Sequence, residues 1–195
     1  MADQDILIGP GQLYFAPLAT ADPNDTTVAF GAAWGGAWVN LGEFIEGQPV
    51  VLAMPETFTE VYTEQSVSPK NAVRNRREIM VKVTLAEHSP ANMTLVLDGT
   101  KTDTPAGAAQ KAVSDIAFGV SPEVKFFKWG IEARRKDSAG TDQPVRWFLN
   151  KGYVKLSGDT PYAKQNATGI PIEIKIMGDG TALGKLQIVT GPITT

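Results

Sequence analysis

The sequence predicts a mainly β protein: a β-sandwich or partly closed barrel with one flanking α-helix and a long hairpin loop. Several short segments alternate between apolar and polar residues, which is typical of half-buried strands. Glycine, with 19 residues, and proline, with 13, are frequent among the 195 residues and indicate many turns. Only one segment carries both the start and the stop signals of a helix. No linker divides the chain, so residues 1–195 are expected to form a single domain.

The clearest strands are the segments 78–86 and 170–177. Apolar side chains occupy alternate positions in each segment, which places them on one face of a strand. These inward positions are Ile79, Val81, Val83 and Leu85 in the first segment and Ile170, Ile172, Ile174 and Ile176 in the second, with Glu173 and Lys175 outward. Further strands are expected at 12–18, 39–45, 49–54, 123–134, 145–156 and 183–189.

A strand that begins near Glu56 has no clean core face. One face carries acidic and aromatic side chains and the other carries threonines and a valine, as far as residue 64. The first face consists of Glu56, Phe58, Glu60, Tyr62 and Glu64. Such a strand is either a solvated edge or part of an assembly wall.

The helix is expected at 90–97. Ser89 is a good N-cap and Pro90 suits the first helical position, while Gly99 is placed to end the helix. Residues 100–112 are rich in Thr, Gly, Pro and Ala and are expected to form a loop with one helical turn near 108–113.

Composition and charge narrow the classes of function. The formal net charge is −3 and the isoelectric point is about 5.2, so the chain lacks the basic character of a domain that grips nucleic acid. The absence of cysteine excludes disulfides and cysteine-based zinc sites and suits assembly in a cytoplasm. Residues 1–5 do not resemble a signal peptide, and no apolar stretch approaches the roughly 20 residues of a membrane helix.

The residues of catalysis and metal binding do not form a site in the sequence. His88 is the only histidine, and it is expected to be a partly exposed residue at the helix entrance. Neither Gly9-Pro10-Gly11 nor Gly178-Asp179-Gly180 is followed by the residues that cradle a phosphate, and the loop aspartates lack calcium-loop spacing. We therefore expect the chain to have no catalytic, metal or cofactor site, and we expect that it is not an enzyme.

Two charged regions stand next to each other. Residues 41–64 contain five glutamates and no Lys or Arg, and the polar stretch 65–77, expected to be a loop, follows directly. The glutamates are Glu43, Glu46, Glu56, Glu60 and Glu64, and the basic residues that follow are Lys70, Arg74, Arg76 and Arg77. They form either two solvated faces or complementary surfaces through which one copy meets the next, which builds rings or filaments.

The order of several short motifs resembles siphophage major tail tube proteins, the tube subunits of long non-contractile phage tails. The resemblance rests on Ile8-Gly9-Pro10-Gly11-Gln12-Leu13-Tyr14-Phe15-Ala16-Pro17, on Trp38-Val39-Asn40-Leu41-Gly42-Glu43 with Glu46-Gly47, on Thr63-Glu64-Gln65, and on Val83-Thr84-Leu85-Ala86-Glu87 with Asn92-Met93. These motifs cover most of the first half of the chain, and the second half is similar only in its strand pattern.

The resemblance implies hexameric rings that stack into a hollow tube, with strands of each copy joined in a continuous inner β-barrel. It further implies that the loop at about 65–77 contacts a neighbouring ring through Lys70, Arg74, Arg76 and Arg77. A tape-measure protein and then genomic DNA occupy the lumen of such tubes, and tail terminator and tail tip proteins bind their ends. The implied location is the virion tail, after assembly in the bacterial cytoplasm and without a membrane partner. Glu56, Glu60 and Glu64 are the candidate lumen-facing residues, and residues 190–195 are expected to form a loose tail.

The sequence is compatible with three alternatives. A tube protein of type VI secretion has a similar fold. A carbohydrate-binding β-sandwich could use Trp34, Trp38, Trp129 and Trp147 as a stacking platform, although Trp129 and Trp147 lie in apolar strands that suit a core. A hydrolase could use carboxylates of the loops, which the sequence does not specifically support.

Overall fold

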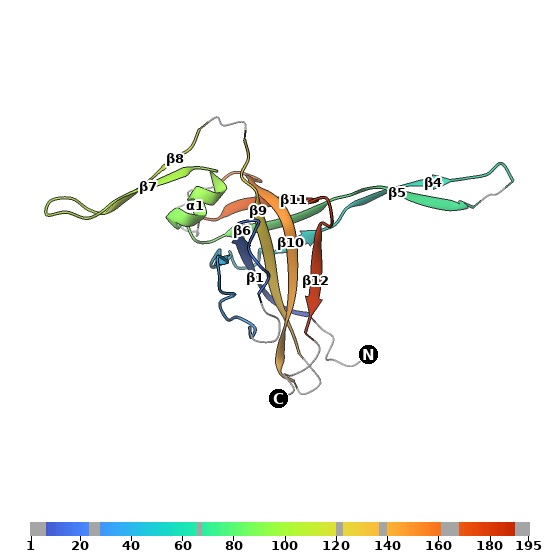
Figure 1. The fold of residues 1–195 in the computed structure, drawn as a ribbon, viewed down its shortest axis with the longest axis horizontal. Coiled ribbons are helices and arrows are strands. Elements are labelled where there is room, and N and C mark those ends of the chain that lie inside the picture. Colours follow the sequence, from blue (N-terminus) through green and yellow to red (C-terminus); the bar gives the residue numbers. More distant parts are fainter. Residues whose placement is uncertain are drawn as a thin grey trace.

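The structure, a computed structural model, describes residues 7–23, 28–65, 68–119, 123–136, 140–160 and 168–189, with only the backbone for residues 7–10. The described part is T-shaped: a body built on one sheet carries two hairpin arms that project in opposite directions (Figure 1). The predicted tail at 190–195 lies outside the described residues.

The body is an eight-stranded antiparallel sheet, which confirms the mainly β class. In spatial order its strands are β2 (Val39–Asn40), β1 (Leu7–Ala16), β9 (Phe127–Lys136), β10 (Asp142–Leu156), β11 (Ile170–Met177), β6 (Ile79–Leu85) and β3 (Val51–Ala53), and β12 (Gly184–Ile188) also pairs with β10. The first half of β10 lies between β9 and β12, and its second half pairs with β11. The pairing of β10 is irregular between Leu149 and Gly152, where a strand can bend. In this way one strand pairs mainly with β9 and β12 before the irregularity and with β11 after it.

The predicted alternation in β6 and β11 is confirmed, and it forms the main core. All eight inward side chains of these two strands are buried, together with Leu13, Trp129 and Leu149 from neighbouring strands. Burying each large aliphatic side chain contributes about 1.5–3 kcal/mol relative to leaving it exposed. Glu173 was predicted to point outward, and it is nonetheless covered by Lys155 and Lys82, whose Nζ atoms lie 2.8 and 3.7 Å from its carboxylate oxygens.

A second, smaller cluster lies under residues 28–38. Trp34 stacks on Tyr14 with ring centroids 4.2 Å apart and also contacts Phe148. Beneath it, the fully buried Glu132 accepts hydrogen bonds from Arg146 Nε at 2.8 Å and Trp34 Nε1 at 3.3 Å. Burial, reinforced by the Glu132 charge, raises the pKa of Tyr14 to about 12. Trp34 therefore covers an edge of the core.

The predicted helix is confirmed as α1 (Pro90–Val96), with its predicted cap. The Ser89 hydroxyl accepts a hydrogen bond from the backbone N–H of Asn92, and the buried Asn92 amide donates to the carbonyl of Leu41 at 3.0 Å. The expected stop is one residue off: Asp98 adopts the left-handed conformation, with φ of 50°, in place of Gly99. An Asp tolerates this conformation better than most residues do.

Two predicted loops are wrong, because both contain strands. Residues 100–112 were expected to form a loop with a helical turn, and instead β7 (Thr100–Thr104) pairs with β8 (Val113–Ala117). Within 65–77, Asn71–Arg77 is strand β5 and pairs with β4 (Glu56–Val61). These strands lie outside the body sheet, so no alternating core pattern marks them in the sequence. The strand expected at 39–45 is limited to β2, since Gly42 has a positive φ of 84°.

Candidate assembly surfaces

The β4–β5 arm is a long hairpin with no buried residue among those described. Every residue of β5 is exposed, as are all residues of β4 except the half-buried Glu56. Phe58 and Val73 are each 52% exposed on opposite faces. A two-stranded hairpin is only marginally stable in water on its own. The rest of the described chain therefore gives this arm almost no burial.

A β-bulge places two arginines of the arm on one face. Thr57 pairs with Arg76 and the next residue, Phe58, pairs with Arg74, so Asn75 is the extra residue. The bulge thus brings Arg74 onto the side that already holds Arg77. Arg74 Nε lies 3.1 Å from Glu56 and its guanidinium lies 5.6 Å from the centroid of the Phe58 ring, while Arg77 also contacts Glu56.

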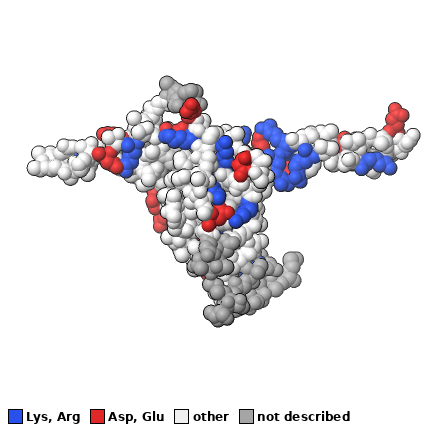
Figure 2. Space-filling view, viewed as in Figure 1, with Lys and Arg blue, Asp and Glu red and all other residues white. Residues whose placement is uncertain are grey.

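The four predicted contact residues thus have different local roles. Arg74 and Arg77 share Glu56, and Arg76 pairs with Glu78 at the root of the arm. Lys70, close to the tip, forms no side-chain ion pair or hydrogen bond with any residue that the structure describes. Figure 2 shows Lys and Arg side chains clustered at the root of the β4–β5 arm, with further charged side chains toward its tip.

The three predicted lumen residues also differ. The Glu56 carboxylate is held between two guanidinium groups. Glu60 accepts a hydrogen bond from the Tyr62 hydroxyl. In the described part of the chain Glu60 and Glu64 have no ion pair, so both carry an uncompensated negative charge.

The β7–β8 arm has a different chemistry. Its tip, residues 104–113, reads Thr-Pro-Ala-Gly-Ala-Ala-Gln-Lys-Ala-Val, and all of these side chains are exposed except the half-buried Thr104. Gly107 and Gln110 exchange backbone hydrogen bonds of 2.9 and 3.2 Å, which closes the turn. The root is anchored by Lys125, whose ammonium donates to the Gly99 carbonyl at 2.9 Å and pairs with Asp98 at 3.2 Å.

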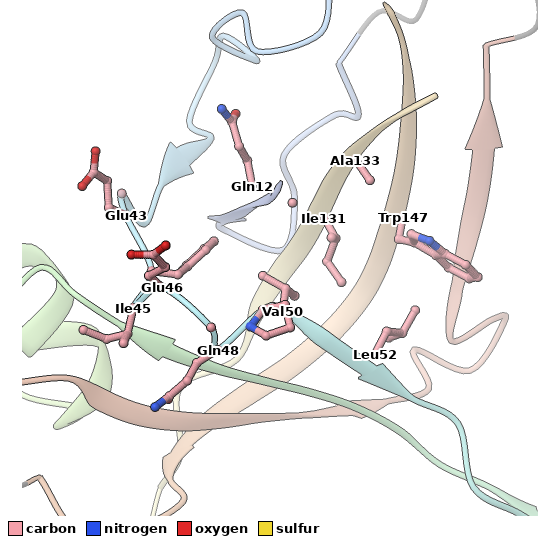
Figure 3. A pocket seen from close by; sticks show the side chains of 15 residues that line it. Gln12, Glu43, Ile45, Glu46, Gln48, Val50, Leu52, Ile131, Ala133 and Trp147 are labelled. Atoms are coloured by element: carbon pink, nitrogen blue, oxygen red, sulfur yellow. The ribbon is translucent and has the colours of Figure 1, made fainter. Parts of the chain in front are cut away.

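An apolar groove of about 800 Å³ lies on the body between β1, the β2–β3 connection, β9 and β10. Its floor and sides include Val50, Leu52, Ile131 and Trp147 (Figure 3). The β2–β3 connection is fixed in place, because Glu43 N–H donates to Glu87 at 3.2 Å and Ile45 N–H donates to the Thr84 carbonyl at 3.1 Å.

The described residues show no constellation for metal binding. They contain no group of three or more His, Cys, Asp or Glu side chains that could hold a metal ion. His88 lies at the helix entrance, where it is exposed and its Nε2 is 2.9 Å from the Thr168 carbonyl. No described helix is both long and apolar enough to cross a membrane.

Two of the four tryptophans are too buried to take part in a stacking platform. Trp129 is fully buried and donates to the Gly152 carbonyl, and Trp34 is buried under residues 28–38. Trp38 packs edge-on against Trp34, with centroids 5.0 Å apart. Stacking of a sugar requires an open aromatic face, which the two buried rings do not offer.

Sequence reasoning missed two of these surfaces. The β7–β8 arm was predicted to be a loop, and the groove joins residues from distant strands, such as Val50 and Trp147. The alternation of Thr100, Thr102 and Thr104 with polar residues was an available signal for a strand, since threonine favours strands.

A family model described as phage tail tube protein matches residues 1–186, which spans both arms, the helix and nearly all of the body. A search of curated proteins gives no match.

Proposed function

The chain belongs to the phage tail tube protein family, a family of structural components of the virion tail, and from this we propose that its copies form stacked hexameric rings that conduct DNA from a long non-contractile tail into the host. Tail terminator and tail tip proteins bind the ends of this tube, and a tape-measure protein occupies the lumen until the DNA passes. Assembly takes place in the cytoplasm of the host bacterium.

The β4–β5 arm is the observation that carries this proposal. It extends the chain well beyond the body and leaves every described side chain of β5 in solvent. An exposed hairpin of this length invites pairing or packing with another chain. In a stacked tube the arm contacts the neighbouring ring, and Lys70, Arg74, Arg76 and Arg77 provide its basic side chains.

Unpaired strand sides in the body support a ring. Among the described residues, β12 pairs only with β10, and β2 covers β1 only at Tyr14 and Phe15. Leu186 and Ile188 of β12 are also 44% and 45% exposed. Pairing between copies at such sides completes an inner barrel and removes the open edges.

The lumen is proposed to carry the negative charge of the arm strand. Glu60 and Glu64 form no ion pair among the described residues, whereas the charge of Glu56 is offset by Arg74 and Arg77. A surface with unpaired carboxylates repels phosphates, so DNA passes without being held.

Negative-stain electron microscopy of the purified chain at high concentration, with light scattering, tests the proposal. Hollow tubes or stacked rings are the expected result. A monomer at every concentration, even after tail tip protein is added as a nucleus, contradicts it.

Charge reversal tests the role of the arm. In one variant Lys70, Arg74, Arg76 and Arg77 are changed to Glu, and in the matched control Lys70→Arg accompanies Arg→Lys at the other three positions. We expect the first variant to keep its circular dichroism spectrum and form no tubes, while the control forms them. Normal tubes from the reversed variant contradict the inter-ring role.

A further inference from the structure

The groove on the body is apolar and has a defined charge. Its walls are apolar, from Phe44, Val50, Leu52 and Trp147, and the only ionisable groups on its lining are Glu43 and Glu46. Both glutamates are exposed, and neither carboxylate forms an ion pair within the described chain. The groove therefore favours an occupant that is apolar and carries a cation.

From this chemistry we infer that the groove of one copy receives the tip of the β7–β8 arm of another copy. This inference deepens the proposed function and rests on it. The tip offers small apolar side chains, including Pro105, Ala108 and Ala109, which fit between the groove walls. It contains one charged residue, Lys111, and no acidic residue. Lys111 has no ion pair or hydrogen bond among the described residues, so its ammonium is available to Glu43 and Glu46.

The tip of the other arm fits the same groove poorly. Toward its tip the β4–β5 arm carries Glu60 and Glu64 beside the single cation Lys70, and these two carboxylates meet the groove glutamates as like charges, whereas the β7–β8 tip has no acidic residue. Its large side chains, such as Phe58 and Tyr62, also require more space than alanines do. Charge and size thus both select the β7–β8 tip.

The partner must be a second copy. The β7–β8 arm extends about eight residues from root to tip, which spans about 25 Å at the rise of a strand, and it projects away from the body in a straight line (Figure 1). Its tip therefore cannot fold back onto the groove of its own chain. A contact between an arm and a different surface of the next copy is heterologous, which closes into a ring when the rotation between copies permits.

Disulfide trapping tests this contact directly, because the chain has no native cysteine. A variant with Ala109→Cys in the tip and Val50→Cys in the groove is oxidised at the concentration at which the unmodified chain assembles. The control variant combines Ala109→Cys with Val73→Cys on the other arm. Because groups held in contact react at a high effective concentration, we expect about tenfold more of a covalent multimer ladder from the first variant.

A charge exchange gives an independent readout. Lys111→Glu is expected to reduce ring and tube formation, and adding Glu46→Lys restores it, whereas adding Glu60→Lys does not. Tubes without a ladder from the tip and groove cysteines, or an equal ladder from the control pair, overturn the inference and leave the proposed function intact. If the unmodified chain forms neither rings nor tubes, the proposed function has failed and the inference falls with it.

Discussion

An arginine–glutamate pair occurs in the body and again in an arm, and the two pairs differ in almost every physical respect. In the body, Arg146 and Glu132 are both 0% exposed and share their hydrogen bonds with Trp34 and the Val28 carbonyl. In the β4–β5 arm, Glu56 is 22% exposed and the side chain of Arg74 is 47% exposed. The first pair stabilises the fold, because it holds residues 28–38 on the sheet. The second pair leaves its charged groups accessible to another chain.

The largest expected effect comes from breaking the buried pair. Arg146→Met leaves the Glu132 carboxylate buried without its cation, and we expect the free energy of unfolding to fall by about 3–5 kcal/mol. The matched change Arg74→Met in the arm is expected to cost less than about 1 kcal/mol, because solvent stabilises the exposed Glu56. Urea unfolding at neutral pH measures both. Equal losses in the two variants contradict the distinction between body and arm.

A pair of phenylalanines extends the comparison to apolar side chains. Phe148 is 0% exposed and Phe58 is 52% exposed. Phe148→Ala is expected to cost about 3 kcal/mol, at the low end for buried phenylalanines because the adjacent loop can relax into the cavity. Phe58→Ala is expected to leave unfolding within about 0.5 kcal/mol and to weaken tube formation. Thermal unfolding and electron microscopy of both variants separate these effects, and a large loss of stability in Phe58→Ala contradicts the arm's proposed role.

The smallest expected effect is one of pH. The Lys155 ammonium, hydrogen-bonded to Glu173, lowers the pKa of Glu173 below its ordinary value of 4.5, against the opposing effect of burial. The carboxylate therefore stabilises the fold above pH 4.5, and this contribution is lost as the pH falls through the folded-state pKa. Urea unfolding from pH 7 to pH 3 is expected to show Glu173→Gln as less stable at pH 7, with the gap closing in acid. A gap that stays constant over this range contradicts the assignment.

The contrast between body and arms also explains what the sequence could predict. The alternating isoleucines of β11 predict a core strand and the Ser89 cap predicts a helix, because burial and capping both produce local patterns in the sequence. The strand β5 has no buried face, so Asn71–Arg77 reads as a polar loop. The partners of its arginines depend on a single bulge at Asn75, which no local pattern indicates. Likewise Arg146 and Glu132 meet across two strands, and their burial depends on a loop more than 90 residues away in the sequence.

The order of strands in the body determines how long each strand waits for its partner during translation. Leu85 of β6 pairs with Ile170 of β11, and Leu13 of β1 pairs with Ile131 of β9. A ribosome that adds 5–20 residues per second needs about 4–17 s to make the roughly 85 residues that separate β6 from its partner. The emerging chain therefore exposes its first strands for seconds before the sheet can close. Unpaired apolar strands favour aggregation, so the interval before the C-terminal strands are translated is the one in which the N-terminal half is most exposed to it.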